Sequence, residues 1–300
     1  MSAILATRST ARPGPTAYGV SMDISAHRRL NDGTTLPPIG FGTYPMTGED
    51  AVGAIRSALE AGYRLLDTAV NYGNEAEVGL AVRTSGLPRE DIQVTTKVPG
   101  RSHARDLAVR SVEGSLLETG LDYLDLVLIH WPNPSVDLYV EAWEGLIEAR
   151  ERGLTRSIGV SNFAAHHLRR IIDATGVVPA VNQLEVHPLF PQEEMLAVNA
   201  GLDILTEAWS PLGKRSAPFA EEPVAAAAQA LGVDPAQVIL RWHLQRGVLP
   251  VPKSATPERQ RNNLAVFDIE LTPQQMADIS GLGRPDGRLF GGDPDTHEEM

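Results

Sequence analysis

The sequence predicts an α/β fold, a (β/α)8 TIM barrel with an N-terminal β-hairpin closing the bottom of the barrel. Short β-branched apolar runs alternate with amphipathic stretches of helical period, which is the pattern of parallel strands joined by helices. Eight such runs follow residue 27. They occupy roughly 250 residues, which is about the length that a barrel of this class needs.

The elements follow one another in a regular order. A hairpin is expected first, over residues 27–37, because Asn31-Asp32-Gly33 is a favourable tight turn. Strand-like runs follow at residues 37–42, 63–67, 91–97, 124–130, 154–162, 179–185, 202–210 and 247–253. Helical stretches separate them, among them residues 49–62, 104–120, 138–153 and 166–176. Three further helices are expected to begin where a proline follows an N-cap residue, at Asp234, Thr256 and Thr272.

The main rival fold is a doubly wound Rossmann sheet, which should carry G-x-G-x-x-G after its first strand. The first strand here gives GFGTYP, in which the third glycine is missing. The chain has no Walker A sequence and no H-E-x-x-H. GVSNF fails as a nucleophile elbow because Phe163 stands where the second glycine belongs. The usual phosphate, hydrolase and zinc signatures are therefore absent.

Composition narrows the class of protein further. The net charge is −12, without a stripe of Lys and Arg, which argues against nucleic acid as a partner. No apolar run is long enough to span a bilayer, so no membrane partner is expected. The lack of cysteine excludes disulfides, thiolate catalysis and cysteine metal sites. We expect a cytoplasmic monomer.

Residues 1–22 differ from the rest of the chain in composition. They hold two arginines, many small residues and prolines, and no acid. We expect a disordered extension, with one domain over residues 23–300, and a transit peptide is the alternative interpretation.

Polar residues end three consecutive predicted strands. Asp67, Lys97 and His130 are spaced 30 and 33 residues apart, one βα unit each. In a barrel, the carboxyl ends of the strands form the catalytic face, so the three should converge there, with Tyr72 in the loop after Asp67. Each alone has an ordinary interpretation as a turn, surface or packing residue. Together, at the same end of their strands, they predict a reaction site.

The residue types indicate carbonyl chemistry. A tyrosine hydroxyl has a pKa of about 10, and a nearby ammonium lowers it. Lys97 can supply that charge, and Asp67 can hold Lys97 in place. His130 can bind and orient a carbonyl oxygen, so that Tyr72 is a general acid beside a polarised C=O. What is missing is an attacking group, and a hydride from a nicotinamide suits that need.

A nicotinamide cofactor has candidate partners elsewhere in the sequence. Trp209 can stack on the ring, while Ser161, Asn162 and Gln183 can bind its carboxamide. Lys253, Ser254 and Arg259 surround a predicted helix N-terminus, which is a favourable anion site. The second cation favours the 2′-phosphate of NADPH. The alternative interpretation of this stretch is an ordinary capped surface helix.

From about residue 27 to 285 the chain resembles the aldo-keto reductase family. The matching segments are GYRLLDTAVNYGNEAEVG, LVLIHWP, GVSNF, VNQLEVHP and VPKSATPERQRNN, in the family's order. The resemblance implies a (β/α)8 barrel that reduces aldehydes and ketones with NADPH, using a tetrad of Asp67, Tyr72, Lys97 and His130.

The resemblance also implies the residues around the ligands. Those lining the cofactor would be Thr43, Asp67, Ser161, Asn162, Gln183, Trp209, Ser210, Leu212, Lys253, Ser254, Arg259 and Asn263. Those facing the small-molecule carbonyl substrate would be Tyr44, Tyr72, His130 and Trp131, with the tail around Leu289-Phe290. Asn262 departs from the glutamate that many relatives place at the adenine.

Two segments, residues 130–162 and 174–188, are similar to bacterial 2,5-diketo-gluconate reductases, which makes small dicarbonyls or keto-sugars plausible substrates. A cofactor-binding or sensing subunit with little turnover is one alternative. A metal-dependent hydrolase is another, but we expect no metal, because only His166-His167 and Glu185-x-His187 resemble ligand pairs.

Overall fold

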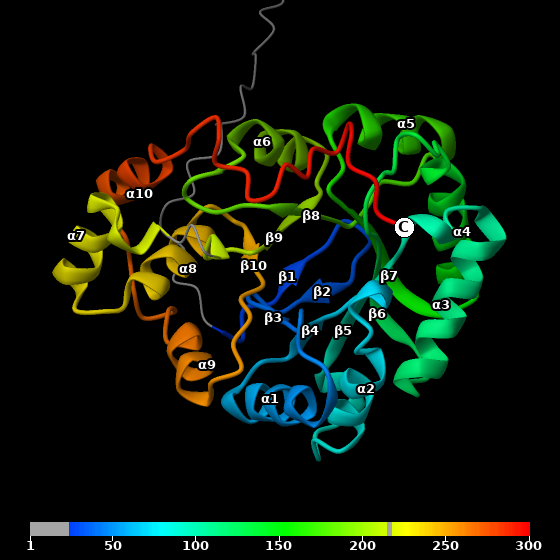
Figure 1. Cartoon of the computed structure of the whole chain (residues 1–300), viewed down its shortest axis with the longest axis horizontal. Coiled ribbons are helices and arrows are strands. Elements are labelled where there is room, and N and C mark those ends of the chain that lie inside the picture. The colour runs from blue at the N-terminus through cyan, green and yellow to red at the C-terminus, as the bar shows by residue number, and fades with distance from the viewer. Residues whose placement is uncertain (1–23, 215–217) are drawn as a thin grey trace, which may run out of the picture.

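The computed structural model describes residues 24–214 and 218–300, and the extension predicted at residues 1–22 lies outside them. Eight parallel strands pair in chain order around a barrel (Figure 1). They are β3 (Phe41–Gly42), β4 (Leu65–Asp67), β5 (Gln93–Val98), β6 (Leu124–Ile129), β7 (Thr155–Ser161), β8 (Val181–Glu185), β9 (Leu205–Trp209) and β10 (Leu249–Pro250). The first and last strands also meet, because the N–H groups of Gly40 and Gly42 donate to Pro250 and Pro252 carbonyls at 3.0 Å. The predicted barrel is confirmed.

Helices follow the strands and surround the barrel (Figure 1). They are α1 (Gly48–Ala61), α2 (Glu75–Arg83), α3 (Arg105–Thr119), α4 (Tyr139–Glu151), α5 (Ala165–Thr175), α6 (Glu193–Gly201), α7 (Glu222–Leu231), α8 (Pro235–Gln245), α9 (Pro257–Leu264) and α10 (Pro273–Ser280). Short 3-10 turns interrupt the loops at η1 (Val70–Tyr72), η2 (Arg89–Asp91), η3 (Gly100–Ser102) and η5 (Pro218–Ala220). Within the described residues, no helix has the length and apolar character needed to cross a membrane.

Proline shortens two of the predicted strands. The runs at residues 37–42 and 247–253 form only the two-residue strands β3 and β10. Both runs are rich in proline, which has no N–H for a sheet ladder. The predicted cap at Thr272 is present, since its hydroxyl accepts from the Gln275 N–H. The helix predicted after Thr256 also begins at Pro257, with Thr256 at the N-cap position, but the Thr256 side chain makes no capping bond.

Period-two alternation along the strands divides the core into two layers. Leu65, Leu126 and Leu128 belong to the cluster inside the barrel, whereas Leu66 and Val127 belong to the cluster between strands and helices. Because these side chains alternate, the residue two positions after each inward leucine also points inward. This register decides which side chains reach the barrel mouth.

The hairpin of β1 (Arg28–Arg29) and β2 (Thr35–Leu36) closes the opposite end. Its residues bond to groups at the starts of β8, β7 and β5: Asn31 Nδ2 donates to Pro179 O, Ser157 Oγ to Asp32, and Gln93 Nε2 to Thr35 O. Leu30 and Leu36, both buried, join the apolar cluster inside the barrel. The predicted closure of the bottom is therefore confirmed, and among the described residues the other end of the barrel is open to a ligand.

Candidate active site

Polar side chains form the inward layer at the carboxyl ends of the strands. Asp67 lies two residues after the inward Leu65, and His130 two residues after the inward Leu128. On β5, Val94 and Val98 face the helices. Lys97 is an odd number of residues from both, so its side chain faces the inside of the barrel. The strand register thus brings together Asp67, Lys97 and His130, as the spacing of the strand ends predicts.

A buried ion pair forms the floor of this layer. Lys97 Nζ donates to both carboxylate oxygens of Asp67, at 2.8 and 2.7 Å, and to the Thr68 carbonyl at 2.8 Å. All three ammonium protons therefore have acceptors. The Lys97 side chain is 0% exposed. Burial alone would lower the pKa of Lys97, but Asp67 holds that pKa above its usual range. The cation is fixed in charge and position.

Tyr72 reaches this pair from η1, directly after β4. Lys97 Nζ lies 5.0 Å from the centre of its ring, and the ring lies against those of His130 and Tyr44, with centroids 5.8 and 5.0 Å away. Burial raises the pKa of Tyr72, and the opposing charge of Lys97 does not offset it. The sequence-based expectation of a net lowering is wrong because it left out burial. A raised pKa keeps the phenol protonated, as a proton donor requires.

His130 follows β6 at the mouth of the barrel. Its carbonyl accepts from Asn162 Nδ2 at 3.0 Å, which ties the exits of β6 and β7 together. Burial lowers the pKa of the imidazole. A carboxylate not considered in the sequence analysis lies beside the ring, because Glu299 Oε1 is 2.9 Å from His130 Nδ1.

Gln183 and Glu207 extend the network across the barrel. Gln183 Nε2 donates to Asp67 at 2.8 Å and to Glu207 at 3.0 Å, which commits both amide protons and leaves its carbonyl oxygen as an acceptor. Burial, with the charge of Asp67, raises the pKa of Glu207 to about 8. The sequence analysis missed Glu207. The sequence feature that could have identified Glu207 was its position two residues before Trp209, in a strand whose side chains alternate between the two sides of the sheet.

One cavity of about 1260 Å³ opens above this network. All residues predicted to line the cofactor lie on its wall, namely Thr43, Asp67, Ser161, Asn162, Gln183, Trp209, Ser210, Leu212, Lys253, Ser254, Arg259 and Asn263. The residues predicted to face the substrate lie there too: Tyr44, Tyr72, His130, Trp131 and, from the tail, Phe290. Leu289 does not line the cavity, and its N–H donates to Glu185 instead. Lys97 lies beneath the wall.

The side-chain amides on the cavity wall make other contacts than those expected from the sequence. Asn162 gives its protons to Ser161 and His130, and its oxygen accepts from Trp209 Nε1 at 2.8 Å. It therefore fixes the indole of Trp209. Among the three residues expected to bind a carboxamide, the oxygen of Gln183 is the group left open for it. Phe290 stacks on Trp209 with centroids 5.4 Å apart.

The far end of the cavity is suited to phosphate. Lys253 and Arg259 are exposed on its wall beside the start of α9, and within the described part of the chain neither forms an ion pair with a carboxylate. The N-terminal N–H groups of a helix and free cations together favour a bound anion. Asn262 also lines the cavity, and its amide donates to Asp234 at 3.3 Å.

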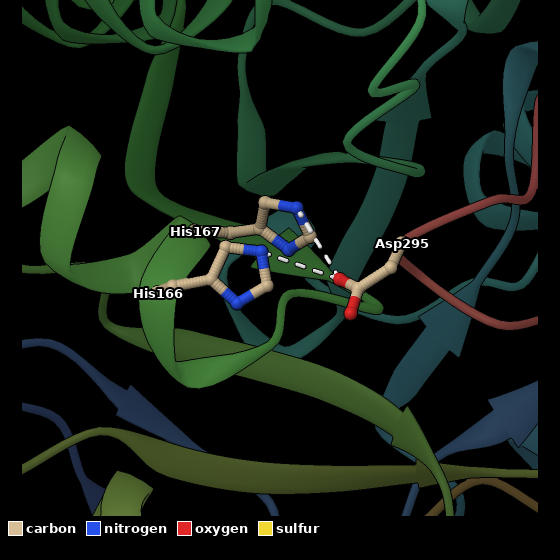
Figure 2. A group of neighbouring side chains, drawn as sticks. All are labelled: His166, His167 and Asp295. Atoms are coloured by element: carbon tan, nitrogen blue, oxygen red, sulfur yellow. Dashed lines mark ion pairs between the residues drawn. The ribbon is translucent and has the colours of Figure 1, made fainter.

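His166 and His167 form a second cluster with Asp295, outside the cavity (Figure 2). His166 Nε2 lies 3.2 Å and His167 Nε2 3.8 Å from one Asp295 oxygen. His167 Nδ1 accepts from the Ala164 N–H, which places the proton of the neutral ring on Nε2. A protonated Nε2 cannot bind a metal. The arrangement is better described as a polar contact that holds the C-terminal segment against α5.

Comparison with known proteins places this geometry among reductases. The model of the aldo/keto reductase family matches residues 38–284. The 2,5-diketo-D-gluconic acid reductase B of Corynebacterium sp. (strain SHS752001) is 55% identical over 271 residues, covering 90% of this chain and 97% of its own. Methylglyoxal reductase DkgA of Escherichia coli (strain K12) is 43% identical over 268 residues, covering 89% and 96%.

Solved structures agree in fold. A variant of Gox0644 in complex with NADPH has a TM-score of 0.86 and 40% identity, covering 91% of this chain and 98% of its own. The Bombyx mori aldo-keto reductase AKR2E4 in complex with NADP has a TM-score of 0.83 and 35% identity, covering 91% and 97%.

The raised pKa of Glu207 predicts a pH-dependent stability. A carboxyl whose pKa is higher in the folded than in the unfolded state holds its proton more tightly when folded. The free energy of unfolding therefore falls as pH rises from the usual carboxyl pKa to about 8. We expect Glu207→Gln to flatten this dependence, so that its stability relative to the wild type increases from acid to alkaline pH. Urea denaturation at a series of pH values measures this difference.

Glu141→Gln is the control, because Glu141 is exposed on α4. Its free energy of unfolding, plotted against pH, should run parallel to that of the wild type. If the plot for Glu207→Gln is also parallel, the conclusion that the pKa of Glu207 is raised is wrong.

Proposed function

The chain belongs to the aldo/keto reductase family, and from that premise we propose that it reduces aldehydes and ketones to alcohols with NADPH. The observation that carries the proposal is the buried Lys97–Asp67 pair beneath Tyr72 and beside His130, at the floor of one open cavity. This arrangement supplies a proton donor and a carbonyl-binding group.

The roles of the four residues follow from their contacts. NADPH, when bound, supplies the hydride for the carbonyl carbon. The Tyr72 hydroxyl gives its proton to the carbonyl oxygen as that oxygen gains negative charge. Lys97 lies against the phenol and stabilises the negative charge left on it, while Asp67 keeps Lys97 charged and fixed. His130, when its Nε2 carries a proton, donates to the carbonyl oxygen and sets its orientation.

The wall of the cavity fits the cofactor in three places. The open oxygen of Gln183 is an acceptor for a carboxamide N–H, because both Gln183 amide protons are already used. Trp209, fixed by Asn162, offers a flat aromatic surface for a ring. Lys253 and Arg259 offer two cations at the start of α9, which suits the extra phosphate of NADPH over NADH.

The substrate we propose is a small dicarbonyl or keto-sugar. The similar proteins of Corynebacterium and Escherichia coli bear the names of a diketo-gluconic acid reductase and a methylglyoxal reductase. Aromatic residues form the outer wall of the cavity, namely Tyr44, Trp131, Phe290 and His297. Lys214, which the sequence analysis missed, lies 5.0–6.0 Å from the ring centres of Tyr44, Trp209 and Phe290 and places a cation beside them.

We further propose that residues 23–300 are one domain that acts as a cytoplasmic monomer. The family model spans most of this range. The large apolar side chains exposed on the described surface, such as Leu80, Leu117 and Leu231, lie on separate helices and form no single stripe. Sedimentation equilibrium tests the monomer, and a dimer over the working concentration range would contradict it.

Replacing the proton donor tests the proposed reaction. We expect the wild type to oxidise NADPH with methylglyoxal or a diketo-sugar acid, and Tyr72→Phe to lower kcat by at least about 100-fold. The affinity for NADPH, measured by quenching of tryptophan fluorescence, should change by less than about threefold, because only a hydroxyl is removed.

Two outcomes would contradict the proposal. Normal turnover by Tyr72→Phe would remove Tyr72 from the reaction. NADPH binding by the wild type without turnover of any carbonyl would favour the alternative, a cofactor-binding or sensing subunit.

The choice of cofactor is tested at α9. Arg259→Ala should weaken NADPH binding by about 10- to 100-fold, the usual loss for a charge-assisted hydrogen bond. NADH, which lacks the 2′-phosphate, should bind within about twofold of the wild type. Titration of both cofactors measures the ratio. Arg261→Ala on the same helix is the control, since Arg261 does not line the cavity. Equal losses for NADPH and NADH would reject the phosphate role.

A further inference from the structure

The C-terminal tail, defined as residues 284–300, crosses the mouth of the barrel (Figure 1). It leaves α10 and passes the end of β8, where the Leu289 N–H donates to Glu185. His297 then lies against Trp131, with ring centroids 4.1 Å apart. The chain ends beside the loops that follow β4 and β5, where Asn71 Nδ2 donates to the Met300 carbonyl at 3.0 Å.

Contacts on several elements hold the end of the tail. Asp295 lies beside His166 at the start of α5 (Figure 2). The Ser135 N–H donates to Glu298 Oε1 at 2.8 Å. The carbonyl of Glu299 accepts from the Gly100 N–H at 3.2 Å and from the Asn133 side chain. The backbone on both sides of the Glu299 side chain is therefore anchored.

Gly100 makes room for this approach. A Cβ atom at that position would lie 2.2 Å from the Glu299 carbonyl oxygen and 2.1 Å from Asn133 Nδ2. Any other residue would force the tail or its anchor to move. The loop after β5 is thus shaped to receive the tail.

The Glu299 side chain points to the catalytic histidine. Glu299 Oε1 lies 2.9 Å from His130 Nδ1, and it also accepts from Asn71 Nδ2. The pair is within ion-pair distance without the alignment of a hydrogen bond, so that His130 Nδ1 and Glu299 Oε2 are both buried without a partner among the described residues. A buried polar atom left unpaired costs about 1–3 kcal/mol, and a hydrogen bond between the two side chains would satisfy His130 Nδ1.

The two edges of the His130 ring face different surroundings. His130 lines the cavity, whereas Glu299 does not. Nδ1 is shut off from solvent. The carboxylate therefore lies behind the imidazole, and the Nε2 edge is the one available to a ligand.

We propose, resting on the carbonyl reduction proposed above, that Glu299 is a positioning residue that fixes the tautomer of His130. Its carboxylate can only accept a hydrogen bond, so it keeps the proton of the neutral imidazole on Nδ1. Nε2 is then an acceptor. It can donate to a carbonyl oxygen only when His130 carries a second proton.

The charged groups around His130 agree with this assignment. Burial has the largest effect and lowers the pKa of His130. Glu299 and Asp67 act against it by favouring the imidazolium, Lys97 disfavours the imidazolium, and Tyr72 is the uncharged neighbour. Burial alone would raise the pKa of Glu299, but its contacts with His130 and Asn71 hold that pKa below its usual range. Glu299 therefore stays an acceptor at neutral pH.

The tautomer has a consequence for the direction of the reaction. A protonated His130 donates from Nε2 and suits a carbonyl substrate, because the oxygen gains negative charge during reduction. A neutral His130 accepts at Nε2 and suits the hydroxyl of an alcohol. Reduction should weaken, and alcohol oxidation should strengthen, as pH rises through the titration of His130.

The decisive experiment is a nitrogen-15 NMR titration of the imidazoles, which reports protonation and tautomer without any cofactor. The chain has eight histidines, and the spectrum of His130→Gln identifies the signals of His130. We expect the neutral wild-type ring to carry its proton on Nδ1. In Glu299→Gln the side-chain amide can accept from Nδ1–H or donate to Nδ1, so the fixed preference should be lost and the Nε2–H tautomer should become populated. A wild-type ring that is protonated on Nε2 when neutral would overturn the proposal.

Kinetics give the second readout. In the wild type, kcat/KM for reduction should fall about tenfold per pH unit above the titration of His130. In the Glu299→Gln variant, kcat/KM for reduction should not fall in this pH range. In Glu299→Asp it should fall again, but less than in the wild type. A profile for Glu299→Gln that matches the wild type would overturn the proposal. Absence of turnover in the wild type would instead contradict the proposed function, and the NMR result would stand.

Two further variants separate charge from tail position. Glu298→Gln removes a charge from the same tail. The Glu298 carboxylate accepts from the Ser135 N–H and makes no hydrogen bond to His130 among the described residues, so tautomer and profile should stay unchanged. Gly100→Ala leaves Glu299 and His130 intact but displaces the tail, and it should behave like Glu299→Gln. A Glu298→Gln variant that reproduces the change would assign the effect to general electrostatics and reject the role of Glu299.

Discussion

The site depends on one interaction, the ion pair of Lys97 and Asp67 inside the barrel. Burying two charges costs several kcal/mol each, and only close pairing with full hydrogen bonding offsets that cost. Lys97 meets this condition with three acceptors at 2.7–2.8 Å. Asp67 in turn accepts from Gln183, which carries the network across to Glu207. Tyr72 rests on the pair, so the position and protonation of the proposed acid follow from it.

The strand register explains how one barrel holds both a stable core and this polar layer. Inward leucines and the hairpin fill the lower half of the interior, and inward polar residues fill the upper half. The same alternation that buries Leu65 and Leu128 directs Asp67 and His130 to the mouth. Stability and chemistry therefore occupy separate layers of the same strands, and the loops and tail above can vary without disturbing the core.

Local pattern was enough to predict the barrel and the meeting of Asp67, Lys97 and His130, because strand alternation places them at successive strand ends. Much of the cavity wall was predicted from the family resemblance instead. Local pattern did not identify Glu207, which stands inside an apolar run and is held by a partner distant in sequence. It could not place Glu299, whose contact with His130 joins residues far apart in the chain. Burial, which sets the direction of the pKa shifts of Tyr72, His130 and Glu207, is also a property of the folded chain alone.

The most direct test of this account is the turnover of Lys97→Met, measured with NADPH and methylglyoxal beside the affinity for NADPH. Methionine keeps an unbranched side chain of nearly the same length and removes its charge. The account predicts a loss of kcat of at least about 100-fold, with NADPH affinity retained, because Lys97 lies beneath the cavity wall, where it contacts Tyr72, Asp67 and the Thr68 carbonyl. Turnover close to that of the wild type in a folded Lys97→Met variant would contradict it.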